Sequence, residues 1–204
     1  MQIRELTITN TSDTAAMRLW QEIMGIYRVS FPDNERRCED NMLSKVIDEP
    51  HFHLYIVQQD ANITDSALEP STGELVAFMT IWNFGEWIYG EYLAVKPTLR
   101  GANIGTKLLN YVYEHWQRPL ILEIERLDEE GLSSEEMLQR QSRLRFYTRL
   151  GFAACTLPYM QPQYSPTQAR VPLMLMERGG NILPDGFERV KTTLYHDVYG
   201  WYES

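Results

Sequence analysis

Cysteine and long apolar runs are both scarce in this sequence of 204 residues, and each scarcity excludes a class of protein. The two cysteines, Cys38 and Cys155, have neither a metal-binding spacing nor a disulfide framework, which favours a reducing cytoplasm. No apolar run approaches the length of a membrane span, and the N-terminus lacks the basic and apolar regions of a signal peptide. We therefore expect a soluble, cytoplasmic protein without a membrane partner.

Basic residues are also few, with 19 Lys and Arg against 28 Asp and Glu and a formal net charge of -9. A partner held through phosphate contacts needs clustered positive charge, so we expect no nucleic acid. An acidic surface suits a cationic or amine-bearing substrate instead. His51 and His53 lack a third ligand at a suitable spacing, so no metal is expected. The length and composition predict one globular domain over residues 1–204.

Hydrophobic periodicity predicts a mixed α/β protein with its sheet at the centre. Strands are expected over residues 3–9, 51–59, 74–84, 120–125, 152–157 and 171–176, and in the run that ends at Val95. A first helix is expected after Ser12 or Asp13, and a second helix is expected to end at about Glu49. Three more helices are expected: one from Asn103 or Ile104 onward, one from a cap at Ser134 to Leu150, and one over about 184–200. Residues 62–73 and the proline-marked segment after Leu157 are expected to be loops.

The most informative stretch covers residues 90–106, which read as a strand, a short turn and a helix. The first N–H groups of a helix have no intrahelical acceptor, and Arg100 adds a positive charge beside them. The small residues Gly101, Ala102 and Gly105 allow a close approach to the backbone. The stretch therefore predicts a pyrophosphate site, although a tight strand-to-helix connection is the better explanation of the turn when the turn is considered alone. The motifs of the P-loop and of dinucleotide folds are missing.

A second stretch covers residues 143–152 and predicts the end of an amphipathic helix. Gly151 is placed for the left-handed position after the helix, and Phe152 is its hydrophobic partner. Tyr147 in this helix is explained by core packing when it is considered alone.

Taken together, these stretches resemble the GNAT superfamily of acyl-CoA-dependent N-acyltransferases. The central motif of that family is matched by Leu93, Ala94, Val95, Arg100 and Gly105, and its second motif by Phe146, Tyr147, Gly151 and Phe152. The predicted order of elements is similar over nearly the whole chain. The resemblance implies a twisted, mostly antiparallel sheet of about seven strands flanked by helices on both faces, followed by the tail helix.

The resemblance also implies a binding site for acetyl-CoA as co-substrate. Its pyrophosphate would lie on the amides of residues 100–106, and its pantetheine would pair with the backbone around Leu93 and Val95. The residues implied in cofactor binding are Leu93, Ala94, Val95, Arg100, Gly101, Ala102, Asn103, Ile104, Gly105 and Thr106. Asn103 stands where the family usually has glycine, and asparagine tolerates a left-handed backbone best among the other residues.

The activity implied by the resemblance is direct attack of a primary amine, from a small molecule or a peptide, on the thioester of acetyl-CoA. Tyr147 matches the general acid of the family. Glu123 and Glu91 are the candidate bases, with Glu123 preferred, and for each a salt-bridged or solvated carboxylate is an equally good reading. The alternative to an enzyme is an acyl-CoA-binding module without turnover. Many members of the family form dimers, so a homodimer is a further expectation.

Aromatic residues fall in segments that resemble those lining the acceptor side in the family. They suggest an apolar or cationic amine, although an aromatic stripe is more often core. These residues are Tyr27, Phe31, Trp82, Phe84, Trp87, Tyr89, Tyr159 and Tyr164.

Overall fold

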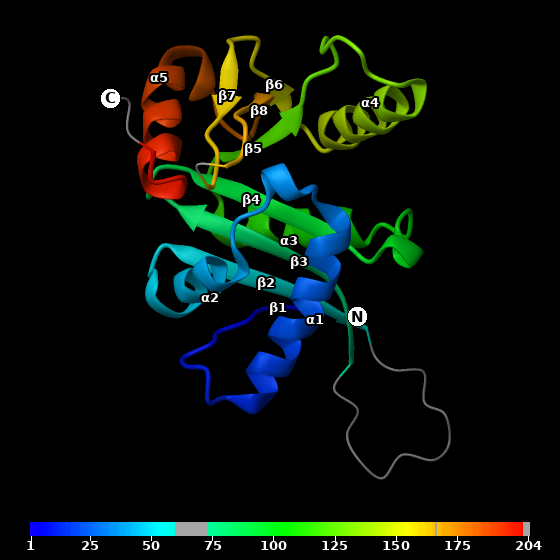
Figure 1. Ribbon diagram of the computed structural model, residues 1–204, viewed down its shortest axis with the longest axis vertical. Coiled ribbons are helices and arrows are strands. Elements are labelled where there is room, and N and C mark those ends of the chain that lie inside the picture. The colour runs from blue at the N-terminus through cyan, green and yellow to red at the C-terminus, as the bar shows by residue number, and fades with distance from the viewer. Residues whose placement is uncertain (60–72, 166, 202–204) are drawn as a thin grey trace. The chain divides into compact units, whose positions relative to one another are not determined.

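The computed structural model describes residues 1–59, 73–165, 167–201 of the chain (Figure 1). They form two compact units. The first unit comprises Met1–Asp33, Arg37–Asn83 and Glu91–Trp116, and the second comprises Asn34–Arg36, Phe84–Gly90 and the chain from Gln117 onward. The loop expected over 62–73 lies outside the described residues except for Gly73. The expectation of a single domain stays a prediction.

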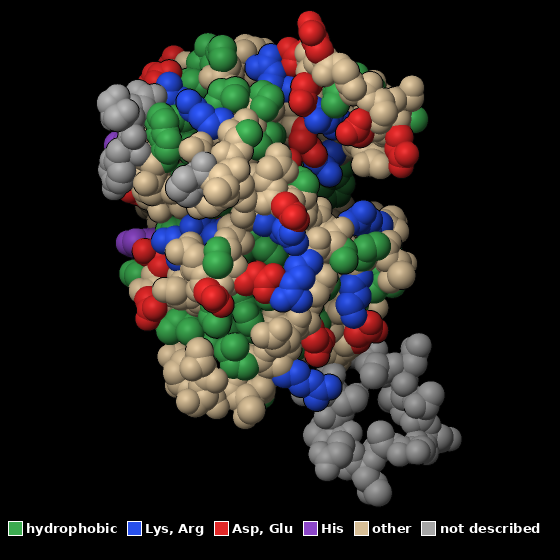
Figure 2. All heavy atoms as spheres, viewed as in Figure 1, with side chains coloured by type: hydrophobic (Ala, Val, Ile, Leu, Met, Phe, Trp, Pro, Cys, Tyr) green, Lys and Arg blue, Asp and Glu red, His purple; other side chains and the backbone are tan. Residues whose placement is uncertain are grey.

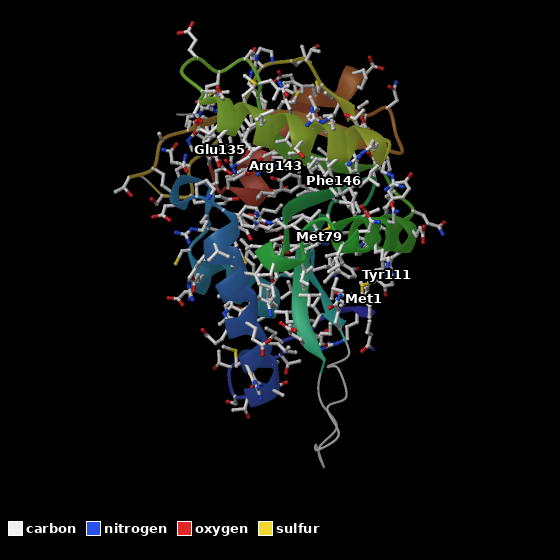
Figure 3. All side chains as sticks on the ribbon, turned by 90° about the vertical axis from the view of Figure 1, so that its right-hand side faces the viewer. Met1, Met79, Tyr111, Glu135, Arg143 and Phe146 are labelled. Atoms are coloured by element: carbon white, nitrogen blue, oxygen red, sulfur yellow. The ribbon has the colours of Figure 1, made fainter. Side chains whose placement is uncertain are left out.

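The first unit is built on strands that carry helices on both faces. Its strands are β1 (Gln2–Glu5), β2 (Phe52–Gln59), β3 (Glu74–Asn83) and the second part of β4 (Ile88–Val95). Its helices are α1 (Thr14–Ser30), α2 (Glu39–Asp48) and α3 (Ile104–Trp116), with short 3-10 turns at Asp33–Glu35 and Pro97–Leu99. Figures 1 and 3 show α1 and α2 on one face of the strands and α3, which carries Tyr111, on the other.

Local sequence explains why α1 forms where it does. The Asp13 carboxylate accepts hydrogen bonds from the backbone N–H groups of Ala15 and Ala16, and such a cap stabilises a helix by about 1 kcal/mol. The helix then buries one apolar face against β3. The buried residues of this face include Trp20, Ile23, Met24 and Tyr27.

The second unit is built around strand β8. Its elements are β5 (Leu120–Glu125), α4 (Ser134–Arg149), β6 (Ala153–Ala154), β7 (Tyr159–Gln161), β8 (Val171–Arg178), α5 (Leu183–Thr193) and a π-helix at Leu194–Val198. Strands β5, β6 and β7 all pair with β8 in antiparallel register, and α4 packs on β5. The long apolar strand β8 thus organises the unit.

The described strands form one mixed sheet of eight strands, in the order β1-β2-β3-β4-β5-β8-β6, with β7 also paired to β8. The pairs β1–β2 and β2–β3 are antiparallel, while β4 and β5 are parallel. The parallel register joins Ile88, Tyr89 and Gly90 to Leu120, Ile121 and Leu122. The predicted mixed α/β fold with a mostly antiparallel sheet is confirmed, with eight strands in place of about seven.

Several boundaries differ from the sequence-based expectations. The first strand, expected over 3–9, is only Gln2–Glu5. The strand expected over 152–157 is only Ala153–Ala154, and the segment expected as a loop contains β7, because β8 offers ladder positions to both. The cap of α4 is Ser133 and not Ser134: its hydroxyl accepts from Glu136 N, and the Glu136 carboxylate accepts from Ser133 N. The tail helix is α-helical only to Thr193 and then widens into a π-helix.

The surface is mixed in charge. On the face seen in Figure 2, acidic and basic side chains are interspersed. Exposed ion pairs such as Arg28–Glu39 contribute to this surface, and such pairs typically add less than about 1 kcal/mol to stability. Within the described ranges, no helix combines the length and the apolar character needed to span a membrane.

Candidate functional site

The turn before α3 has the backbone of an anion site. Gly101 and Asn103 have φ angles of 86° and 59°, so both are left-handed, and α3 begins at Ile104. Asn103 therefore has the left-handed backbone that glycine adopts readily and that asparagine tolerates. Its carbonyl accepts from Lys107 N at 3.0 Å, which closes the first helical turn. The N–H groups of the first helical residues have no intrahelical acceptor, so they are suited to hold an anion.

The turn is more exposed to solvent than the strand that precedes it. Residues 100–103 are exposed, Gly105 and Thr106 are half-buried, and the Ile104 side chain is buried beneath them. In β4, Leu93 and Val95 are half-buried while Ala94 is buried. After the strand, Lys96 N donates to Val76 O and the 3-10 turn Pro97–Leu99 leads to Arg100. The predicted cofactor-binding residues thus form one continuous, partly exposed stretch of the first unit.

Glu91, the first candidate base, is part of a buried ion pair in the first unit. Its Oε1 accepts from Arg37 Nη2 at 2.8 Å and Nε at 3.1 Å, and its Oε2 accepts from Trp82 Nε1 at 2.8 Å. The side chains of Arg37 and Glu91 are 6% and 1% exposed. Both oxygens of the Glu91 carboxylate thus have buried partners within the first unit, which favours the structural reading of Glu91.

The backbone of Arg37 also contacts aromatic residues of the first unit. Arg37 N donates to the Tyr92 hydroxyl at 3.0 Å, and the Tyr27 hydroxyl donates to Arg37 O at 3.1 Å. The rings of Tyr27 and Phe31 both pack on Tyr92, each with centroids 4.9 Å apart. Burial raises the pKa of Tyr27. In the first unit these aromatics are therefore core groups around Arg37.

Glu123, the second candidate base, lies in the second unit and accepts hydrogen bonds from two phenols. It is half-buried and follows Leu122, the last residue of β5 in register with β4. The Tyr159 hydroxyl donates to its Oε1, and the Tyr199 hydroxyl donates to its Oε2 at 2.8 Å. Burial, followed by the negative charge of Glu123, raises the pKa of Tyr159 well above its ordinary value.

Tyr199 is the functional candidate that the sequence analysis missed. Its hydroxyl also accepts from Gln161 Nε2 at 2.9 Å and lies 3.2 Å from the Tyr89 hydroxyl. Its ring packs on Tyr164 with centroids 4.9 Å apart. The tail helix is indicated by the spacing of Phe187, Val190, Leu194 and Val198, a pattern that does not include Tyr199.

Tyr147, the predicted general acid, is buried near the end of α4. Its ring packs on Phe146, labelled in Figure 3, and on Phe152 at 5.4 Å. Burial raises the pKa of Tyr147 to about 12, although the nearby positive charge of Arg143 lowers it. The phenol is therefore a weaker acid than an unperturbed tyrosine and remains protonated at physiological pH.

Glu35 is a further carboxylate that the sequence analysis did not single out as a base. Burial raises its pKa, while the charges of Arg143 and Arg140 lower it. In the same unit, Arg143 also pairs with Glu125, and Arg140 pairs with Glu129 at 2.6 Å. The carboxyl group of Glu35 thus lies near the charged side chains of Arg143, Arg140 and Glu129.

The site residues predicted from the sequence are divided between the two units. The cofactor stretch and Glu91 belong to the first unit, whereas Glu123 and Tyr147 belong to the second. Tyr89 and Tyr164 contact Tyr199, and Tyr159 donates to the carboxylate that Tyr199 also contacts. Phe84 packs on Trp87 with centroids 4.5 Å apart. His53 pairs with Glu5 at 2.8 Å, and none of the described residues form a group of three or more potential metal ligands.

The described part of the chain is an α/β protein with a mixed sheet, and the backbone of the turn before α3 is suited to hold an anion. The family model described as "Acetyltransferase (GNAT) domain" matches residues 50–154, just over half of the chain. The chain therefore belongs to the GNAT family of acetyltransferases. Membership supports an acyltransferase that uses acyl-CoA.

Solved structures agree with this assignment. A protein from Bacteroides thetaiotaomicron assigned to the GNAT acetyltransferases is 26% identical, with a TM-score of 0.78 and coverage of 99% of this chain and 100% of that chain. An aminoglycoside 6'-N-acetyltransferase complexed with coenzyme A is 17% identical, with a TM-score of 0.57 and coverage of 87% and 96%. The Escherichia coli ribosomal-protein-S18-alanine N-acetyltransferase is 17% identical, with a TM-score of 0.54 and coverage of 87% and 92%. At 17% identity the last two show the fold alone.

Proposed function

We propose that this protein transfers an acetyl group from acetyl-CoA to a primary amine of a small molecule or a peptide. The observation that carries the proposal is the left-handed backbone at Asn103, because it preserves the anion-binding turn at the one position where the sequence departs from the family motif. The family membership and the coenzyme A complex of the aminoglycoside acetyltransferase support the choice of cofactor.

In this proposal the pyrophosphate of acetyl-CoA binds the amides of residues 100–106 beside the Arg100 guanidinium. The residues that would hold it are Arg100, Gly101, Ala102, Asn103, Ile104, Gly105 and Thr106. The backbone around Leu93, Ala94 and Val95 would pair with the pantetheine. No side chain needs to supply a metal ligand.

Glu123 is the base of the proposed reaction. A primary amine is mainly an ammonium ion at neutral pH, because its pKa lies near 10, so a proton must leave before nitrogen can attack the thioester. The Glu123 carboxylate takes that proton, and the neutral nitrogen then forms a bond to the acetyl carbonyl carbon. The carbon–sulfur bond breaks with its electron pair on sulfur, and nitrogen releases a second proton to solvent, which balances the proton taken up by the thiolate. Glu91 has a structural role in this proposal, because its charge is already paired with Arg37.

Tyr147 is the proton donor to the departing thiolate. Its pKa of about 12 keeps the hydroxyl protonated throughout the physiological range, so it is always available as a hydrogen-bond donor. A phenol that is this weak as an acid stabilises the thiolate by hydrogen bonding before it transfers the proton.

We infer the class of the amine acceptor from two structural relatives and from the net charge of this chain. One relative is an aminoglycoside acetyltransferase and the other acetylates an alanine of a ribosomal protein, so a small molecule and a peptide both fit the fold. The net charge of -9 favours a cationic amine. We place the activity in the cytoplasm, in a single domain over 1–204 that forms a homodimer and binds no nucleic acid.

The second candidate function is acyl-CoA binding without turnover. Asn103 favours it, since a side chain at this position is close to where the pyrophosphate would lie and weakens cofactor binding. The hydrogen bonds from Tyr159 and Tyr199 to the Glu123 carboxylate favour the acetyltransferase over the binding module.

Calorimetric titration of acetyl-CoA, free CoA and ATP into the purified protein separates these possibilities. Micromolar binding of both CoA compounds without binding of ATP is expected. Thiol release with a panel of amines then supports the enzyme, while tight CoA binding with no thiol release from any amine supports the binding module. An absence of heat with all three nucleotides contradicts both.

A further inference from the structure

The C-terminal segment beyond residue 154 lies outside the part of the chain that matches the GNAT family model, yet it supplies groups to Glu123. Within it, the π-helix Leu194–Val198 ends in a wide turn in which Tyr199 N donates to Leu194 O at 3.1 Å. Such wide turns are rare and are often found at functional sites, because they redirect a side chain out of the regular helical pattern. The side chain that follows this turn is that of Tyr199.

The hydrogen-bond partners of the Tyr199 hydroxyl determine that its proton is donated to Glu123. A carboxylate can only accept, so the 2.8 Å contact with Glu123 Oε2 uses the single phenol proton. Gln161 Nε2, at 2.9 Å, then donates to the phenol oxygen, and the Tyr89 hydroxyl, at 3.2 Å, takes the donor role as well. The phenol is thus held from β4 and β7 while it donates to β5.

The chain on either side of Tyr199 is anchored, as terminal segments commonly are not. The Tyr195 hydroxyl donates to Met160 O at 2.6 Å and accepts from Arg170 Nη2 at 3.1 Å. Arg170 also lies over the Trp201 ring at 4.7 Å, and Trp201 N donates to Tyr195 O at 2.8 Å. These contacts lie on either side of Tyr199 in sequence, while the Tyr199 hydroxyl is placed by its own bonds to Glu123, Gln161 and Tyr89.

We propose that Tyr199 is a positioning residue for Glu123, so that the C-terminal segment is a working part of the acyl-transfer site. The inference rests on the proposed function, in which Glu123 takes the proton of the acceptor ammonium. Tyr199 orients the carboxylate through Oε2, while Tyr159 holds Oε1. Tyr199 does not itself exchange a proton with the substrate in this scheme.

The groups that surround the carboxylate determine how it titrates. Tyr159 from β7 and Tyr199 from the tail donate to it directly, and Tyr89, Gln161, Tyr195 and Arg170 lie behind these two phenols. A hydrogen bond to the charged form of an acid favours that form. Loss of the Tyr199 hydroxyl therefore makes the Glu123 carboxyl easier to protonate, so the acidic limb of the rate profile moves to higher pH.

The test compares Tyr199→Phe with Tyr195→Phe in the full-length protein. Both variants remove one phenol oxygen from the same segment, but only the first of these oxygens contacts Glu123. For Tyr199→Phe we expect kcat to fall roughly tenfold and the acidic limb to move up by about one pH unit, with the KM for acetyl-CoA unchanged. For Tyr195→Phe we expect a lower melting temperature and an acidic limb at its wild-type position.

A second measurement does not depend on turnover. Carbon NMR of protein labelled at the glutamate carboxyls follows the titration of Glu123, which is assigned by its disappearance in Glu123→Gln. A titration displaced only in Tyr199→Phe supports the positioning role even where no amine is acetylated, an outcome that would count against the proposed function alone. A titration equal to wild type in Tyr199→Phe, or displaced equally in Tyr195→Phe, overturns the inference.

Discussion

The two units each contain a glutamate on a strand of the sheet, and the two carboxylates have different partners. In the first unit Glu91 is paired with the Arg37 guanidinium at 2.8 Å. In the second unit Glu123 accepts from the phenols of Tyr159 and Tyr199. A guanidinium carries a full charge and stabilises the ionised carboxylate strongly, whereas a neutral phenol stabilises it less. We therefore propose a structural role for Glu91 and a proton-transfer role for Glu123.

The strongest test of this comparison is Glu123→Gln. We expect kcat to fall about 100-fold or more, as on loss of a general base, and the acidic limb of the rate profile to flatten. Glu125→Gln, two residues along the same strand, is the control, because Glu125 is engaged with Arg143. The measurement is the steady-state rate of thiol release as a function of pH. A wild-type profile in Glu123→Gln would remove this residue as the base.

The structural half of the comparison is tested by Arg37→Met and Glu91→Gln. Removing one partner of a buried ion pair leaves the other charge unpaired, and we expect a loss of about 3–5 kcal/mol in the free energy of unfolding for Arg37→Met. Urea denaturation measures this loss. The double variant Arg37→Met with Glu91→Leu is expected to recover much of it, because no buried charge then remains. A Glu91→Gln variant that stays fully stable but loses activity would reverse the roles assigned here.

Tyr147→Phe is expected to have an intermediate effect. Loss of the donor to the thiolate lowers kcat about tenfold or more without changing acetyl-CoA binding. Stability gives a second readout. The folded pKa of about 12 lies above the unfolded value near 10, so this phenol's contribution is complete below pH 10 and is lost as pH rises toward 12. In Tyr147→Phe the decline in unfolding free energy between pH 10 and 12 should be shallower than in wild type; an unchanged decline would indicate that the phenol is not buried.

The smallest expected effect is that of Asn103→Gly in the anion-binding turn. Its φ of 59° suits glycine, and the missing side chain leaves more room for a phosphate, so acetyl-CoA affinity should rise roughly two- to fivefold by calorimetry. Gly101→Ala is the opposite change, because a φ of 86° strains any side chain, at a cost of about 1–2 kcal/mol. Weaker binding in Asn103→Gly would mean that the asparagine side chain itself binds the cofactor.

The sequence by itself determined the order of the elements and the family. Local signals explain this success: Asp13 caps α1, Gly151 takes the left-handed position after α4 with a φ of 86°, and Asn103 tolerates the turn before α3. The boundaries that sequence misplaced, at β6, β7 and the start of α4, depend on ladder positions along β8 or on a choice between adjacent serines. The choice of serine is a one-residue difference, and the two short strands depend on pairing with a strand distant in sequence, so periodicity resolves neither.

Only the tertiary structure decided what each functional candidate touches. Arg37 is 54 positions from Glu91, and Tyr199 is 76 positions from Glu123, so no local pattern links them. Whether a carboxylate is neutralised by a guanidinium or held by phenols depends on which distant strand or tail segment packs against it. Residue identity determined that Glu91, Glu123 and Tyr147 were candidates, and long-range packing assigned their environments, because charge pairing and desolvation act through space and not along the chain.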